Sequence, residues 1–536
     1  MKFNKLALAV AMSAATSLAV AGTDNLDRTV TLEFLGTYAA SVFDEGAAEI
    51  VAHDPETQQL FVINANDASV DVLDIHDPSQ PTKTGHIDAK TIGASANSVA
   101  VDRGIVAVAI EAADKQSNGS VAFYRASDLA LLKVVPVGAL PDMVTFSPNG
   151  QFVLVANEGE PNDDYDVDPE GSVSVIDLRR GVAEASVATA DFRAYIGKED
   201  ELRAQGVRIF GPNANAAQDF EPEYIAMSGD SRTAWVTLQE NNALAVVDVM
   251  HAKVREILPL GYKDHTLPGN ELDASDRDDA INIANWPLLG MYLPDSIASY
   301  QGIGGTFLVT ANEGDSRSYD GFDEEARVKD LDLDPTAFPD ADTLQENENI
   351  GRLKVTSTLG DSDGDGDYDA LYAFGARSFS IWDPTGHLVY DSGADIERIT
   401  AEHLPDDFNS NNDENDSFDS RSDDKGPEPE GVTVGKIAGR SYAFVGLERV
   451  GGILVADVTD PTRVKFEDYV NHRDFTVADV EDDITSGTNQ TGDLGPEGLY
   501  FIPAHASPIG QPLLVVGNEV SGTTTLYRVN ISKAPY

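Results

Sequence analysis

The sequence predicts an all-β fold, a seven-bladed β-propeller with long loop insertions. Three observations predict it. A unit of three or four short apolar strands recurs seven times, turn signals separate the strands, and the units show no helical periodicity. A β-sandwich and a parallel β-helix are the alternatives, but the repeat is too long and too irregular for the coils of a β-helix.

The clearest unit begins at Pro141 and ends at Asp177. Its first strand leads into the turn Ser147-Pro148-Asn149-Gly150, and Asn-Gly between two apolar runs is a strong hairpin signal. Its second strand ends in Asn157-Glu158. We expect segment 30–38, which precedes the first unit, to supply the outer strand of the last blade and close the ring. The acidic or equivalent residues at the start of the first strands of the seven units are Glu49, Asn97, Asp142, Glu223, Asp295, Glu430 and Glu497.

The N-terminus predicts the compartment. Lys2 and Lys5 precede an apolar stretch that ends in the small residues Ala19-Val20-Ala21, which indicates a signal peptide over residues 1–21; a buried N-terminal helix is the alternative. Residues 22–536 are then expected to form a single propeller domain. No later stretch reaches the roughly 20 apolar residues of a membrane span. Because no anchor follows the last strand, we expect a secreted or periplasmic monomer without membrane insertion.

Charge and composition exclude several classes of partner. The formal net charge is −54, which repels nucleic acid and anionic lipid. The chain has no cysteine, so disulfides and thiolate metal sites are excluded. Two interpretations of the acidity remain: adaptation to a salty medium, and binding of hard cations such as Ca²⁺.

The repeat predicts a ring of carboxylates at one end of the central channel. The first strand of a blade lies nearest the axis and the second runs antiparallel to it, so the start of the first and the end of the second are neighbours on one face. Both positions are acidic in most units, and crowded carboxylates need cations or protons. The alternative is that each acid caps amides of its own blade. The candidate metal ligands are Glu49, Asp67, Glu158, Glu223, Glu313, Glu430, Glu448, Glu497 and Glu519.

A second candidate calcium site lies in an aspartate-rich loop. Carboxylates occupy positions 1, 3 and 5 of a calcium-loop pattern, and Gly366 falls at position 6, where the sharp turn needs a positive φ. Tyr372 stands at position 12 instead of the usual Glu, so the bidentate ligand must come from elsewhere. A solvated Asp-Gly turn is the alternative. The candidate ligands are Asp361, Asp363, Asp365, Asp367 and Asp369.

Three insertions interrupt the period, at about residues 250–293, 315–370 and 390–429. The second is expected to split blade five between its second and third strands. Loops of this length are uncommon unless they are functional or disordered. They lie where a rigid scaffold would carry a binding site.

Several long motifs resemble the bacterial choice-of-anchor I family. They are Leu140–Pro161, Asn312–Arg317, Leu371–Asp383 and Ser420–Gly431, and the resemblance covers nearly all of the chain after residue 21. The family is similar to the mesenchyme-specific cell-surface glycoproteins of biomineralising animals and to part of an atypical, secreted cyanobacterial alkaline phosphatase. The resemblance implies a secreted protein and assigns no catalytic residue.

Two functions follow as hypotheses. One is a Ca²⁺-dependent phosphoester hydrolase acting on phosphorylated small molecules, in which the channel polarises phosphate and activates water. In this hypothesis the few basic side chains bind the phosphate oxygens. The alternative is that they pair with nearby carboxylates, which is favoured for Arg377. The other is a non-enzymatic calcium-binding module that contacts extracellular surface components; an oxidoreductase or lyase is a lesser alternative. The candidate catalytic residues are Glu158, Glu313, Arg317, Arg421 and Lys425.

Overall fold

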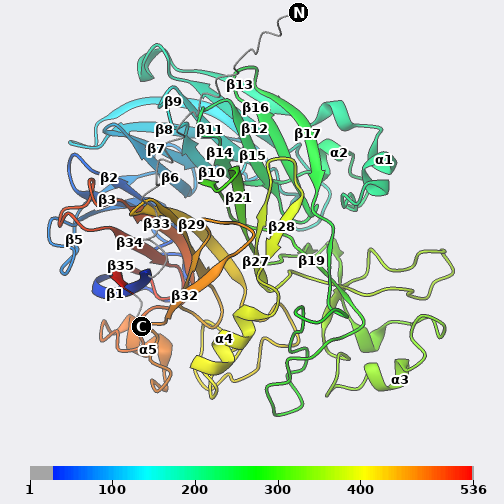
Figure 1. Cartoon of the computed structure of the whole chain (residues 1–536). Helices are drawn as coiled ribbons and strands as arrows, with labels where there is room; N and C mark the ends of the chain where they lie inside the picture. The colour runs from blue at the N-terminus through cyan, green and yellow to red at the C-terminus, as the bar shows by residue number, and fades with distance from the viewer. Residues whose placement is uncertain (1–27, 534–536) are drawn as a thin grey trace, which may run out of the picture.

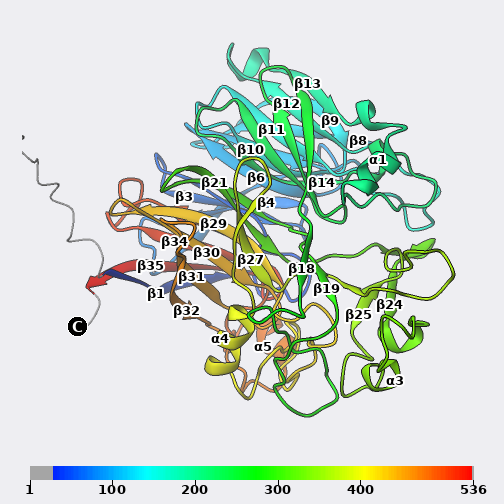
Figure 2. The ribbon, with the colours of Figure 1, turned by 45° about the vertical axis from the view of Figure 1, so that its right-hand side comes forward.

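Seven four-stranded antiparallel sheets form the body of the protein in a computed structural model that describes residues 28–533 (Figures 1 and 2). Each sheet corresponds to one repeat, so the predicted seven-bladed propeller is confirmed. The predicted signal peptide lies outside the described residues.

Blades one to four are built in simple chain order, each strand pairing antiparallel with the next. Their strands are β2 (Val51–Asp54), β3 (Gln59–Asn64), β4 (Ser69–Asp74) and β5 (Thr82–Asp88); β6 (Ala96–Asp102), β7 (Ile105–Ile110), β8 (Asn118–Arg125) and β9 (Leu131–Ala139); β10 (Pro141–Phe146), β11 (Phe152–Asn157), β12 (Ser172–Asp177) and β13 (Ser186–Asp191); and β14 (Pro222–Met227), β15 (Thr233–Leu238), β16 (Ala243–Asp248) and β17 (Lys253–Pro259).

Blades five and seven carry the two predicted irregularities, and both are confirmed. In blade five the insertion separates β21 from β27, and in blade seven β1 pairs with β35 from Arg28 opposite Lys533 to Ala39 opposite Thr523. The strands are β20 (Ile297–Gly302), β21 (Gly305–Asn312), β27 (Ser378–Trp382) and β28 (Leu388–Asp391); β29 (Pro429–Ile437), β30 (Arg440–Leu447), β31 (Ile453–Asp457) and β32 (Lys465–Val470); and β33 (Pro496–Ile502), β34 (Leu513–Asn518), β35 (Thr523–Lys533) and β1 (Arg28–Ala39).

The core lies between neighbouring blades, because each sheet packs on both faces. Every residue of the second strand β11 is buried, whereas the outer strand β13 is mostly exposed. One cluster joins blades three and four through Leu154, Phe220 and Val236, and another joins blades seven and one through Leu60 and Val515. Burial on both faces explains why the middle strands are continuous apolar runs without the alternation of a half-exposed strand.

The insertions do more than connect strands. Two of them build a five-stranded sheet beside the propeller, in the order β18 (Tyr262–Asp264), β19 (Leu289–Met291), β26 (Tyr372–Ala373), β25 (Lys354–Thr356) and β24 (Glu325–Arg327). A core that includes Leu272, Ile350 and Leu371 packs with it. Figure 2 shows β19, β24 and β25 with α3 (Ala341–Leu344) on one side of the molecule. The sequence suggested only loops here because each strand is two or three residues long.

The helices are short. Within residues 28–533, no helix is long and apolar enough to cross a membrane. The remaining elements are the hairpin β22 (Ser318–Tyr319) and β23 (Phe322–Asp323); the helices α1 (Glu199–Ala204), α2 (Ala216–Asp219), α4 (Asp395–His403) and α5 (Val480–Thr485); and the 3₁₀ turns η1 (Val182–Glu184), η2 (Arg193–Tyr195) and η3 (Val328–Asp330).

Candidate metal centre

A β-bulge sits beside the first acidic residue of the blade. In blade three, Pro141 pairs with Asn157 and Val144 with Val155, so Asp142 and Met143 share the space of one partner residue. Bulges re-aim side chains, and this one accompanies an acid that points at the axis. Equivalent shifts occur at Ala96/Ser98, Pro222/Ile225, Pro429/Val432 and Pro496/Leu499.

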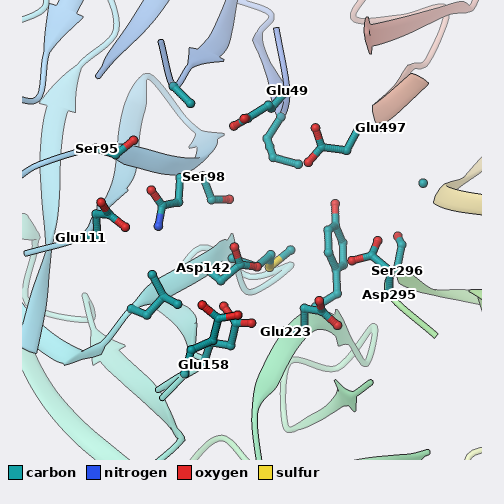
Figure 3. Close-up of a pocket in the computed structure, with 18 of the residues that line it drawn as sticks. Glu49, Ser95, Ser98, Glu111, Asp142, Glu158, Glu223, Asp295, Ser296 and Glu497 are labelled. Atoms are coloured by element: carbon teal, nitrogen blue, oxygen red, sulfur yellow. The ribbon is translucent and has the colours of Figure 1, made fainter. Parts of the chain in front are cut away.

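The acids surround a cavity of about 430 Å³ at the channel mouth (Figure 3). Among the described residues that line it, Lys115 alone is basic. Tyr224 and Met143 lie deeper and also line the next stretch of the channel. The eight acidic lining residues come from six blades: Glu49, Glu111, Asp142, Glu158, Glu160, Glu223, Asp295 and Glu497.

Most of these carboxylates lack a protein partner. Glu160 accepts a hydrogen bond from the Tyr319 hydroxyl at 3.2 Å, whereas the other seven make no side-chain hydrogen bond or ion pair within residues 28–533. One carboxylate oxygen of Glu223 and one of Glu497 are buried without any partner. The idea that each acid caps its own blade's amides therefore fails for these residues.

Burial and mutual repulsion shift the proton affinities of the ring. Burial first, and then Glu519 and Asp142, raises the pKa of Glu49 to about 8. Burial, followed by the charge of Glu160, raises the pKa of Asp142 to about 7. The pKa values of Glu158, Glu223, Asp295, Glu430 and Glu497 are raised well above the ordinary carboxyl value by burial and by neighbouring carboxylates. The ring therefore needs protons or cations to stay compact near neutral pH.

Buried asparagines fix the ends of three second strands. The Asn157 amide donates to the Ser174 hydroxyl at 3.0 Å, and Asn312 donates to Ser380 at 2.8 Å in blade five. Asn518 donates to the hydroxyl of Thr523 in blade seven. These bonds anchor the residue just before the glutamate, which explains the recurring Asn-Glu pair.

Blade one breaks the pattern, and the prediction for Asp67 is corrected. Ala65, the residue after Asn64, lines the channel cavity. Asp67 lies beyond the end of β3 and lines a separate pocket with Lys83 and Lys90. The turn after Asn64 carries Asp67 past the channel rim.

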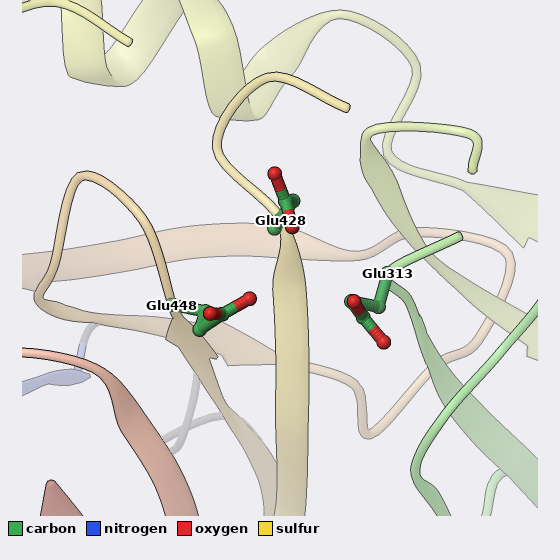
Figure 4. Close-up of side chains that lie close together, drawn as sticks. All are labelled: Glu313, Glu428 and Glu448. Carbon is green, nitrogen blue, oxygen red and sulfur yellow. The ribbon is translucent and has the colours of Figure 1, made fainter. Parts of the chain in front are cut away.

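At blades five and six, a basic side chain of the protein lies among the acidic residues of the channel mouth. There Glu313, Glu428 and Glu448 place carboxylate oxygens within 4.8 Å of one another (Figure 4). The Lys425 ammonium lies 2.6 Å from Glu313 and 3.2 Å from Glu428, and it is 8% exposed. A protein cation therefore occupies this side.

Two arginines add positive charge beside the same group of glutamates. Arg421 pairs with Glu428 at 2.5 Å, while Arg449 bridges Glu428 and Glu448 at 3.1 Å each. Although burial acts in the opposite direction, Lys425, Arg421 and Arg449 together hold the pKa of Glu428 below its usual range. This acid stays ionised without a metal.

Arg317, the third cation that the sequence predicts as a phosphate ligand, also forms ion pairs with carboxylates of the protein. Arg317 is 1% exposed, pairs with Asp219 at 2.7 Å and with Glu221 at 3.0 Å, and stacks on Phe210. Arg377 pairs with Glu397 at 2.7 Å, as the alternative interpretation expected. The structure thus places Arg317, Arg421 and Lys425 in ion pairs with the protein's own carboxylates.

The aspartate-rich loop brings its carboxylates together on the surface. Asp361, Asp363 and Asp365 form one group with oxygens within 4.8 Å of one another. Asp367 and Asp369 form a second group with Asp334, which comes from a neighbouring segment. Asp334 thus adds a carboxylate to the second group, and it does not replace the position-12 glutamate beside Asp361, Asp363 and Asp365. Both groups can hold a metal ion by composition, and their oxygen donors suit Ca²⁺.

Residues 49–461 match the model of the choice-of-anchor I domain. The chain belongs to this family. The resemblance inferred from the motifs is therefore confirmed.

Two curated proteins are related to the chain. Gigasin-3a of Magallana gigas is 33% identical over 192 residues, which cover 35% of this chain and 67% of that protein. The mesenchyme-specific cell surface glycoprotein of Strongylocentrotus purpuratus is 29% identical over 281 residues, covering 45% of this chain and 35% of that protein. The family is thus related to a cell-surface glycoprotein.

Solved structures resemble the chain at lower identity. A hydrazine synthase of Kuenenia stuttgartiensis is 13% identical with a TM-score of 0.45, covering 90% of this chain and 96% of the other. The WD40 domain of Toxoplasma gondii coronin is 10% identical with a TM-score of 0.45, covering 95% and 87%. These scores are modest, and the strand pairing itself defines the propeller.

Sequence reasoning missed four residues of the candidate sites. Glu160 and Glu428 each lie two positions from a predicted ring acid, so an acid-x-acid spacing was the available signal. Lys115 follows the second strand of blade two, where only its basic character in an acidic chain marks it. Asp334 comes close to the loop residues Asp367 and Asp369 from an earlier part of the insertion, and no local sequence pattern predicts that contact.

Proposed function

We propose that the chain is a secreted or periplasmic calcium-binding propeller that acts as a non-enzymatic interaction module. The observation that carries the proposal is the channel cavity, in which eight carboxylates from six blades face Lys115 as the basic lining residue. Seven of the eight carboxylates have no partner in residues 28–533. Hard divalent cations are the natural counter-ions for such a site.

Ca²⁺ suits the donor set better than other common metals. All of the acidic groups offer oxygen, and flexible coordination by six to eight oxygens at varied positions is characteristic of Ca²⁺. Among the lining residues there is no histidine, which disfavours zinc. The loop at Asp361 is proposed as a second, weaker calcium site because Asp361, Asp363 and Asp365 are exposed.

Binding is favoured over catalysis because the expected phosphate ligands are engaged. Arg317, Arg421 and Lys425 are held by carboxylates, and freeing any of them would leave buried charge unpaired. The relationship to a cell surface glycoprotein supports extracellular surface components as partners. We propose that the chain contacts them as a monomer.

One observation favours a hydrolase as the second candidate. Lys115 is exposed at the cavity and makes no ion pair within residues 28–533, so a metal-bound phosphorylated small molecule could reach it. In that case Glu158 or Glu313 would be the candidate base. The bound metal would supply Lewis-acid polarisation of the phosphate.

A paired assay separates the two functions. The chain is stripped of metal, and thermal unfolding and hydrolysis of a chromogenic phosphomonoester and phosphodiester are measured with and without Ca²⁺. The proposal expects a Ca²⁺-raised melting temperature without turnover. Turnover that depends on Ca²⁺ and disappears in Lys115→Gln would replace the module by the hydrolase, and the absence of any Ca²⁺ effect on melting would refute both.

A further inference from the structure

A buried polar cluster joins two insertions outside the channel cavity. Asp273 comes from the insertion after blade four, and Asn409 and Asp419 come from the one before blade six; all three are at most 3% exposed. Glu397 of α4 links them, because it accepts from the Asp273 backbone amide at 3.1 Å and from the Asn409 side chain at 3.0 Å. None of these residues lines the channel cavity.

Two oxygens in this cluster are buried without a partner. The Asn409 side-chain nitrogen donates to Glu397 and, at 2.9 Å, to the Ser422 hydroxyl. Because a carboxylate only accepts, this bond fixes the amide orientation and leaves Oδ1 as the unpaired atom. Asp419 accepts from Ser422 through Oδ1 at 2.5 Å, while its Oδ2 has no partner. Both orphan oxygens thus belong to groups bonded to one hydroxyl.

The charges around Asp419 are also unbalanced. Arg377 forms an ion pair with Glu397, and Arg352 forms one with Asp276 at 2.6 Å. No basic side chain within residues 28–533 pairs with Asp419. Burial first, and then Asp273, Asp278 and Asp276, raises the pKa of Asp419 to about 8. An unpaired buried carboxylate beside an unpaired amide oxygen is costly unless an ion is present.

We propose that a structural Ca²⁺ ion binds here, with Asp419 Oδ2 and Asn409 Oδ1 as its protein ligands, water as the remaining ligands, and the nearby carboxylates of Asp273 and Asp278 adding negative charge. Oxygen ligands of this kind, part carboxylate and part amide carbonyl, are those that Ca²⁺ prefers. The ion holds Asn409 and Asp419 of the insertion before blade six together, and Glu397 bonds this segment to Asp273 of the insertion after blade four. This site is separate from the channel and does not depend on the proposed function.

Trp286 provides a local reporter. Its indole nitrogen donates to the Leu272 carbonyl at 3.2 Å, one residue from Asp273. Tb³⁺ replaces Ca²⁺ in oxygen sites and luminesces when a nearby tryptophan is excited. The metal-free full chain is titrated with Tb³⁺ under tryptophan excitation, and then with Ca²⁺ in competition. We expect a component of the sensitised emission that Trp286→Phe removes and that Ca²⁺ displaces.

Substitutions at the ligands decide the assignment. Asp419→Asn should weaken Tb³⁺ binding at the Trp286-sensitised site by at least about tenfold, the scale on which metal sites lose affinity even when an outer partner is removed. Asp416→Asn is the matched control, an exposed acid of the same loop. Asn409→Leu, checked for folding by circular dichroism, tests the second ligand should Asp419→Asn unfold. Unchanged affinity in a folded ligand variant, or sensitised emission that Trp286→Phe leaves entirely unchanged, would overturn the proposal.

Discussion

The two sides of the channel mouth apply the same acidic repeat in opposite ways. At blades five and six, segment 421–428 brings Arg421 and Lys425 onto Glu313 and Glu428, and Arg449 adds a third cation. Across the mouth, acids of blades one to four, together with Asp295 of blade five and Glu497 of blade seven, face a cavity where Lys115 is the one basic lining residue in the described chain. A ring of acids can thus be stabilised by the protein's own cations, and it needs external cations where those are absent.

The largest expected effect comes from removing the lysine that pairs with the glutamates at blades five and six. Lys425→Met should destabilise the fold by about 3–5 kcal/mol, because it leaves Glu313 and Glu428 without their shared ammonium. Chemical denaturation measures it, with the exposed Lys436→Met as control. Should Ca²⁺ partly rescue Lys425→Met, this side of the mouth would be a latent metal site; a loss below about 1 kcal/mol would show that the ion pair is dispensable.

The next effect is the pH dependence of the empty side. The folded-state pKa of Glu49 is raised to about 8 and that of Asp142 to about 7, so the native state binds more protons than the unfolded chain. The stability of the metal-free chain should therefore fall as the pH rises from about 4.5 to 8. Ca²⁺ at 100 times its Kd should restore about 2.7 kcal/mol. At one fixed Ca²⁺ concentration the gain should be larger at pH 8 than at pH 5, because deprotonated carboxylates bind the ion more tightly. Calorimetric melting with and without Ca²⁺ tests this, and a Ca²⁺ gain that shrinks as the pH rises contradicts it.

A single neutralised acid should distinguish the two sides by sign. Glu158→Gln removes a carboxylate without a partner, so it should stabilise the metal-free chain by about 1 kcal/mol at pH 8 while weakening Ca²⁺ binding. The exposed Glu184→Gln serves as control. Denaturation and calcium titration measure both quantities, and a destabilised metal-free Glu158→Gln chain would mean that the cavity acids are structurally satisfied.

The smallest effect is expected at Lys115. Because this side chain is exposed and unpaired, Lys115→Gln should leave stability within about 0.5 kcal/mol of the parent. It should also tighten Ca²⁺ binding slightly, since a positive charge leaves the cavity rim. Calcium titration at low and high salt checks this, and tighter binding that is insensitive to salt would place Lys115 outside the cavity's field.

The propeller was predictable because its signals are local and repeated. The Asn-Glu ends and the acids at the strand starts recur in sequence, the Asn149-Gly150 turn marks the clearest unit, and the strand that closes the ring could be placed by counting. The neutralisation of one side could not be foreseen, because Lys425 and Glu313 are far apart in the chain. Asp67 was misassigned because a short turn, rather than composition, decides whether a side chain reaches the channel.

The most direct measurement is a calcium anomalous difference map from crystals of the Ca²⁺-loaded chain. We predict a peak in the channel cavity among Glu49, Asp142 and Glu158, and none among Glu313, Glu428 and Glu448, where Lys425 already lies. A cavity without anomalous density at saturating Ca²⁺, or a peak confined to the Lys425 side, would contradict the claim that the empty side of the mouth is the metal site.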